Sequence, residues 1–108
     1  REAFAFLSRF GLTFDAWCYH TQIDEVADLA RAFPETSIVL DHIGGPLGIG
    51  PFAGRQHEVF SGAWKPAMAR LAACPNVNVK LGGVMPLNGF GFELRSKPPS
   101  SSELAEVL

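Results

Sequence analysis

Short apolar segments with strand character alternate with helical patterns along this chain, and this alternation limits the folds that it can adopt. We expect strands at 12–18, 37–42 and 77–81, which are rich in aromatic or β-branched residues and too short for globular helices. Strands separated by helical crossovers pair in parallel, so the order predicts an α/β fold. The continuous apolar run of 37–42 is typical of a strand buried on both faces of such a sheet.

The expected helices are marked by apolar residues at helical spacing, within 3–10, 23–33 and 64–72, and a fourth begins near residue 101. Before the second helix, Thr21 offers a hydroxyl for N-capping, and an acidic residue follows three positions later as an approximate capping box.

The length allows one modest hydrophobic core and therefore at most one domain. The chain opens directly into a helical pattern and ends in a helix that has only just begun. We therefore interpret residues 1–108 as an internal segment of a single domain, truncated at both ends. Periodicity alone does not separate an open doubly wound sheet from part of a barrel, and three strands cannot close a (β/α)8 barrel of about 250 residues.

Composition argues against charged macromolecular partners. The formal net charge is −2, and Lys and Arg are scattered without a basic stripe. We therefore expect no nucleic-acid and no membrane partner, and a small-molecule substrate instead. Cys18 and Cys74 lie far apart in apolar surroundings and are interpreted as buried thiols of an intracellular protein. No signal peptide or membrane-spanning run is present, which predicts a cytoplasmic location.

Ligands of parallel α/β folds bind beyond the carboxyl ends of the strands, and His42 ends the second expected strand. Neutral imidazole is a common metal ligand and also acts as a general base near neutral pH. A histidine that only caps a buried strand by hydrogen bonding is an equally good interpretation of its position. Gly44 and Gly45 favour the functional one slightly, because glycine lets backbone approach a ligand closely.

The end of the first expected strand supplies weaker candidates. His20 is a candidate metal ligand beside His42, and an exposed loop histidine is the alternative. Asp15 and Trp17 share one face of this strand by period-2 alternation. Asp15 could orient a ligand histidine or make a structural hydrogen bond, and Trp17 is a candidate substrate contact.

Two cationic residues are candidate substrate contacts. Lys80 interrupts an apolar strand, so it should pair with a carboxylate or face a polar site. Arg55, in the first long loop, could clamp a substrate carboxylate with two hydrogen bonds, although most loop arginines are simply solvated.

Four segments resemble the amidohydrolase-2 family, in particular its predicted metal-dependent TIM-barrel hydrolases, which include sugar-lactone and dicarboxylate lactonases. They are Phe14-Asp15, Ile23–Pro34, Ile38–Pro46 and Asn76–Gly83. The resemblance covers nearly the whole chain, and Leu-Asp-His-Ile-Gly-Gly-Pro is its most specific part. It implies a partial (β/α)8 TIM barrel, whose fifth, sixth and seventh strands are the three expected here.

The resemblance also implies the roles of the two histidines. The strand-six histidine of the superfamily lies in the metal centre or acts as an acid/base beside it, which maps onto His42. The strand-five ligand maps onto His20. The His-x-His pair of strand one and the Asp of strand eight are absent from this segment. A divalent metal, Zn²⁺ first, is the implied cofactor, with metal-independent chemistry as the alternative.

The implied activity is hydrolysis, in which activated water opens a sugar lactone or a dicarboxylate lactone. His42 would be the ligand or acid/base, and Lys80 and Arg55 would bind the substrate. Decarboxylation of an aromatic or muconate-like acid is the alternative within the superfamily, and a non-catalytic fragment or degenerate barrel is the alternative outside it. Homo-oligomeric assembly is left open. As an isolated piece, the 108-residue chain is expected to be inactive.

Overall fold

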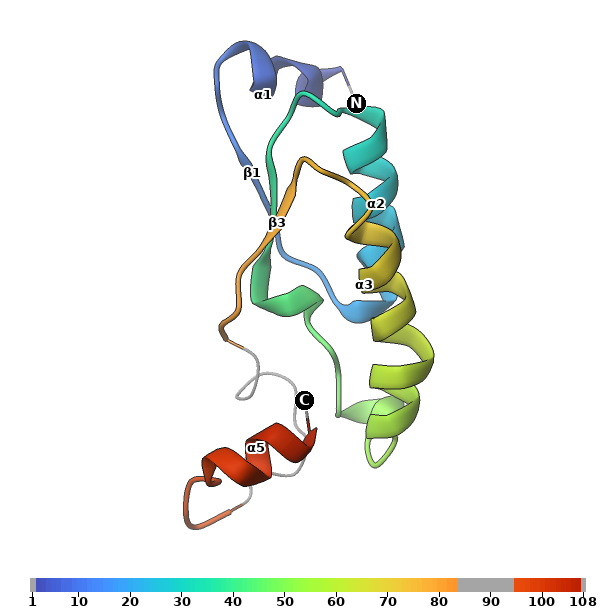
Figure 1. Ribbon diagram of the computed structural model, residues 1–108, viewed down its shortest axis with the longest axis vertical. Coiled ribbons are helices and arrows are strands. Elements are labelled where there is room, and N and C mark those ends of the chain that lie inside the picture. The colour runs from blue at the N-terminus through green and yellow to red at the C-terminus, as the bar shows by residue number, and fades with distance from the viewer. Residues whose placement is uncertain (1, 84–94, 108) are drawn as a thin grey trace.

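The computed structural model describes residues 2–83 and 95–107, and its centre is a three-stranded parallel sheet (Figure 1). The strands are β1 (Phe14–Ala16), β2 (Ile38–Leu40) and β3 (Val77–Val79), in the order β1-β2-β3. Both pairings are parallel, with the first, second and third residues of each strand in register. The predicted α/β fold with parallel strands is therefore confirmed, although each strand is shorter than expected.

Helical segments precede, connect and follow the strands. They are η1 (Ala3–Ala5), α1 (Phe6–Arg9), η2 (His20–Gln22), α2 (Ile23–Ala32), η3 (Asp41–Gly44), η4 (Gly50–Phe52), η5 (Glu58–Trp64), α3 (Lys65–Leu71) and α5 (Ser101–Val107).

Two expectations about these helices need correction. Thr21 does not cap α2, since it lies inside the turn η2, where the Tyr19 N–H donates to Gln22 Oε1 (3.3 Å). The third helix begins earlier than residue 64, because a π-helical segment, η5, runs directly into α3.

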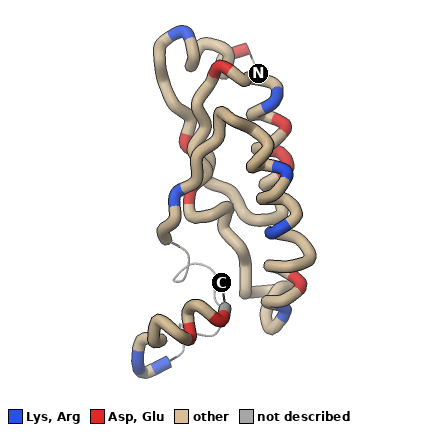
Figure 2. Tube along the Cα trace, in the orientation of Figure 1, with Lys and Arg blue, Asp and Glu red and all other residues tan. Residues whose placement is uncertain are grey.

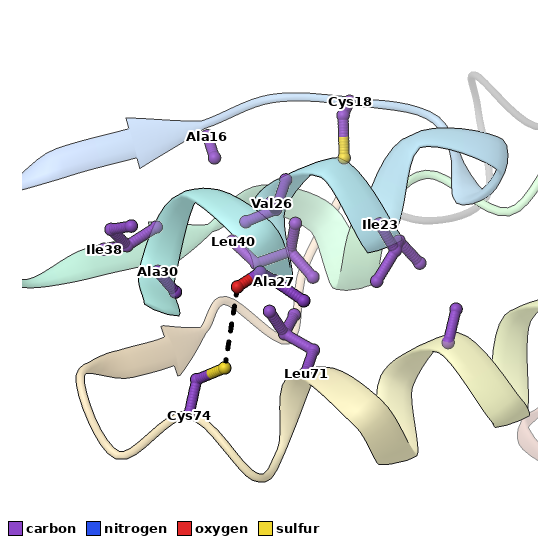
Figure 3. Close-up of a cluster of buried hydrophobic side chains, with 11 residues drawn as sticks. Ala16, Cys18, Ile23, Val26, Ala27, Ala30, Ile38, Leu40, Leu71 and Cys74 are labelled. Carbon is purple, nitrogen blue, oxygen red and sulfur yellow. Dashed lines mark hydrogen bonds between the residues drawn. The ribbon is translucent and has the colours of Figure 1, made fainter. Parts of the chain in front are cut away.

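The core lies between the sheet and the helices α2 and α3, which pack side by side on one face of the sheet (Figures 1 and 3). Ile38 and Leu40 of the central strand are fully buried there. The residues facing them from α2 include Ala27 and Ala30, whose small side chains let the helix approach the sheet closely. Removing this apolar surface from water is the main stabilising contribution to the fold.

The opposite face of the sheet is not covered by any element that the structure describes. This face carries the middle residue of each strand and, just beyond the strands, residues that point the same way. We call this surface the open face; it comprises Asp15, Trp17, Val39, Asn78 and Lys80. Of these residues, only Val39 is half-buried, and the other four are exposed. The expected burial of 37–42 is complete on the face that packs against α2 and α3, and Val39 on the open face is half-buried within the described chain.

Among residues 2–83 and 95–107, no helix combines the length and the apolar character needed to cross a membrane.

Asn76 ties the end of α2 to the start of β3. Its side-chain Nδ2 lies 3.2 Å from the carbonyl oxygen of Ala30, 3.1 Å from that of Phe33 and 3.0 Å from that of Thr36. The Ala30 carbonyl lies in the last turn of α2, where backbone acceptors lack partners within the helix, and the other two carbonyls follow the end of the helix. The two hydrogens of one amide are thus shared among three carbonyls, which joins the end of α2 to the chain that leads into β2.

We expect Asn76→Ala to lower the free energy of unfolding by about 1–3 kcal/mol, because the carbonyls of buried Ala30 and Thr36 and of half-buried Phe33 lose a donor. Asn76→Asp should cost at least as much, since a carboxylate of the same shape places acceptors against acceptors. Urea unfolding of the full-length protein measures both effects. A stability of Asn76→Asp equal to that of the wild type would contradict this role for the amide.

Candidate active site at the carboxyl ends of the strands

Immediately after β2 the backbone turns sharply, and this turn carries His42. His42 (φ 51°, ψ 44°) and Ile43 (φ 50°, ψ 26°) both adopt the left-handed conformation. Non-glycine residues rarely do so, and a β-branched residue such as Ile43 least of all. Each such residue costs on the order of 1–3 kcal/mol and persists only where surrounding contacts hold it. This observed strain marks the turn as a candidate functional element.

The His42 ring is oriented by the chain that follows β3. Its Nδ1 lies 2.8 Å from the carbonyl oxygen of Gly82. A carbonyl only accepts, so Nδ1 is the protonated nitrogen and Nε2 keeps its lone pair. A side chain at Gly83 would place Cβ within 2.9 Å of three atoms of the ring, so this position requires glycine. The geometry leaves Nε2 as the basic atom of His42, in the arrangement that metal-binding and general-base histidines share.

Lys80 bridges two carboxylates, that of Asp15 in β1 and that of Asp41 directly after β2. Its Nζ lies 2.6 Å from Asp15 Oδ2 and 2.8 Å from Asp41 Oδ1. The contact with Asp15, and next that with Asp41, raises the pKa of Lys80 above its ordinary value of 10.5. The expected pairing of Lys80 with a carboxylate is therefore observed. Asp15 makes a structural hydrogen bond, which was one of the two roles considered for it.

Asp41 is a site residue that sequence reasoning missed. Its side chain is only 16% exposed, against about half for Lys80 and Asp15. Within the described chain, its buried Oδ1 accepts no hydrogen bond of good geometry, and the ammonium of Lys80 balances its charge. Its position directly before His42, at the end of a strand, together with a Lys in the next apolar strand that needs a carboxylate, could have indicated this role.

His20 lies in different surroundings from His42. It is 3% exposed, its Nδ1 accepts the N–H of Leu47 (3.3 Å), and its ring packs edge-on against Phe52 (4.8 Å between centroids). Burial lowers the pKa of His20 below its ordinary value of 6.5, so the ring is neutral at pH 7. Since Nδ1 accepts, the proton is on Nε2, and neither nitrogen keeps a free lone pair. His20 thus fastens the long loop after His42.

The other two predicted substrate contacts also differ in their surroundings. Arg55 forms an ion pair with Glu58, with Nε 2.9 Å from Oε2, and also donates to the carbonyl oxygen of Pro51 (3.3 Å). Arg55 and Glu58 line a cavity of about 140 Å³ together with His20. Trp17 is 54% exposed, and its ring meets Tyr19 edge-on at 5.0 Å. Of the three predicted substrate contacts, Trp17 and Lys80 therefore lie on the open face and Arg55 does not.

Trp64 is a second residue that the sequence did not single out for the site. Its Nε1 donates to the carbonyl oxygen of Ile43 at 2.7 Å, across 21 residues of sequence. Because Ile43 directly follows His42, this hydrogen bond fixes the turn from the helical side.

The described residues do not form a metal centre by themselves. In the part of the chain that the structure describes, no three His, Cys, Asp or Glu side chains gather closely enough to hold a metal ion. His42, with Nε2 free, fits a single ligand position, and His20 as placed fits none. Figure 2 shows Lys and Arg interspersed with Asp and Glu along the helices and strands, so the site does not lie in a region of one charge.

The bridge at Lys80 should make stability depend on alkaline pH. Because contact with the carboxylates raises the pKa of Lys80, its stabilising contribution is complete below 10.5 and is lost as pH rises through the raised value. We expect urea-unfolding stability to fall more steeply above pH 10.5 in the wild type than in Lys80→Met. The exposed Lys65→Met variant should follow the wild type, and a constant gap between wild type and Lys80→Met would contradict the bridge.

Comparisons with known proteins identify the family of the chain. The family model Amidohydro_2, described as amidohydrolase, matches residues 1–108. The chain is 39% identical over 84 residues to protein y4mH of Sinorhizobium fredii, an alignment that covers 78% of this chain and 26% of that protein. It is 38% identical over 73 residues to the L-fucono-1,5-lactonase of Burkholderia ambifaria, covering 68% and 22%. The chain thus spans about a quarter of the length of these relatives.

Two crystal structures of an amidohydrolase from Burkholderia multivorans have the same fold. The structure with bound zinc gives a TM-score of 0.72 at 24% identity, covering 98% of this chain and 34% of the other. The structure with bound HEPES gives 0.74 at 23% identity, covering 95% and 33%. The likeness confirms the predicted fold class, three parallel strands and flanking helices of a partial (β/α)8 barrel. On the match of the family model to its whole length, the chain belongs to the amidohydrolase family.

Proposed function

We propose that the full-length protein hydrolyses a lactone and that His42 activates the attacking water. The observation that carries this proposal is the orientation of His42, whose Nδ1 is held by Gly82 while Nε2 remains basic at the carboxyl edge of the sheet. Membership of the amidohydrolase family supports hydrolysis, and the relative that is an L-fucono-1,5-lactonase supports a lactone as the bond to be opened.

In this reaction Nε2 of His42 takes a proton from water while the water oxygen bonds to the lactone carbonyl carbon. The tetrahedral intermediate then breaks the ring C–O bond, and the proton passes to the departing alkoxide, which gives a hydroxy acid. On the open face, the Lys80 ammonium keeps one N–H beyond those directed at its two carboxylate partners, which can donate to a substrate oxygen, and Trp17 offers an exposed ring. Arg55 stays a predicted substrate contact, at present paired with Glu58.

A divalent metal remains part of the proposal only as a partner of His42. Nε2 cannot bind a metal and accept a proton at the same time, so its two roles are alternatives. Because no three candidate ligands gather among the described residues, at least one further ligand of such a metal would come from outside them. The zinc in the structure of the Burkholderia multivorans relative favours testing this arrangement.

Other expectations stay predictions. They are the assignment of residues 1–108 to strands five to seven within one barrel domain, the cytoplasmic location, the lack of nucleic-acid and membrane partners, and homo-oligomeric assembly. The open face, which bears Trp17 and the ion pairs of Lys80, supports a place in a larger barrel, whose further strands would enclose it, and leaves the strand numbers a prediction.

We expect His42→Ala to lower kcat/KM of the full-length protein for a sugar lactone by roughly 100-fold or more, because general-base catalysis is lost. The assay uses a panel of sugar lactones, L-fucono-1,5-lactone among them, and dicarboxylate lactones, each with and without chelator. His57→Ala is the matched control, since His57 is an exposed histidine of the same chain. Loss of wild-type activity on chelation would show that a metal is needed and would favour the ligand role of His42, whereas retained activity would favour the general-base role. Wild-type-like turnover by His42→Ala would refute both roles.

A further inference from the structure

The strained turn that carries His42 is fastened by a side chain from a distant helix. We propose that Trp64 is a positioning residue, which holds the His42 imidazole in its reactive orientation through the backbone of Ile43. This inference rests on the proposed function, in which His42 carries out the proton transfer.

The need for such a residue follows from the backbone conformation. His42 and Ile43 are the non-glycine residues at positive φ within the described chain, and they are consecutive. A β-branched side chain at positive φ clashes with its own backbone, so an unrestrained chain would leave this conformation. The His42 ring would leave with it, since the ring is attached at the first of the two strained residues.

Both polar backbone groups of Ile43 are held from outside the turn. Its N–H donates to the carbonyl oxygen of Lys80 (3.1 Å), and its carbonyl oxygen accepts from Trp64 Nε1 (2.7 Å). The first bond comes from the chain just after β3 and the second from the end of η5. The turn is therefore fixed between the sheet and the helical layer, and the side chain of Ile43 is itself buried.

Trp64 is well placed for this role. It ends the π-helical segment η5 directly before α3, packs against the hydrophobic core and meets Phe60 edge-on at 5.7 Å between ring centroids. Extra-wide helical turns of this kind occur often at functional sites, where they change the direction of a side chain. A half-buried indole also needs a hydrogen-bond acceptor, and the Ile43 carbonyl supplies it.

The test is Trp64→Phe in the full-length protein, which keeps an aromatic ring and removes the N–H. We expect kcat for a sugar lactone that the wild type turns over to fall roughly 10- to 100-fold with little change in KM, because a displaced catalytic group lowers the rate of the chemical step. In ¹H–¹⁵N spectra, the wild-type His42 ring should show the single tautomer with the proton on Nδ1. Trp64→Phe should show a mixture of tautomers, with the His42 signals identified by their loss in His42→Ala.

Leu71→Val is the control, since it removes a methylene group from the core without touching the turn. It should lower stability and leave both kcat and the His42 tautomer unchanged. The proposal is overturned if Trp64→Phe keeps the wild-type kcat and tautomer, or if both variants lose kcat alike. A His42→Ala variant with wild-type turnover would instead defeat the proposed function, while a tautomer change in Trp64→Phe would still show that Trp64 positions the ring.

Discussion

The packing of one face of the central strand determines most of this structure. β2 is paired on both edges, and its side chains Ile38 and Leu40 are completely buried against α2 and α3. Because the side-chain period of a strand is two, burial of these residues directs Val39 to the opposite face. The parallel register then places Asp15 and Asn78 beside Val39. Hydrophobic packing on one side thus decides which polar groups gather on the other, although none of them contributes to the core.

The same packing explains why a strained turn persists after β2. After Leu40 the chain leaves the sheet in η3, and Gly44 and Gly45 lie too close to Ile23 and to the Cys18 carbonyl to carry side chains. The stabilisation gained by the surrounding contacts therefore offsets the left-handed conformation of His42. Strain of this kind is characteristic of functional sites, where the geometry of one side chain matters more than local stability.

The spacing of apolar residues along the sequence predicted the elements that bury one face. Helical spacing located α2, and the apolar run before His42 located β2 and its carboxyl end, because burial imposes a period that sequence displays directly. The hydrogen bond from Trp64 to the turn spans 21 residues, and the bridge from Lys80 to Asp15 spans 65. The residues next to Trp64 and Lys80 in the sequence do not indicate which groups these side chains contact. The need of Lys80 for a carboxylate could be predicted, but the identity of that carboxylate required the register of three strands.

The two histidines show why a residue's chemistry has to be judged from its partners. Both follow strands at the same edge of the sheet, and both have Nδ1 engaged by backbone. The Gly82 carbonyl at His42 requires a donor, so the lone pair remains at Nε2. The Leu47 N–H at His20 requires an acceptor, so Nε2 carries the proton in a neutral, buried ring. For His20 to bind a metal it would have to release the loop or change its tautomer, whereas His42 can bind or accept a proton without breaking any contact.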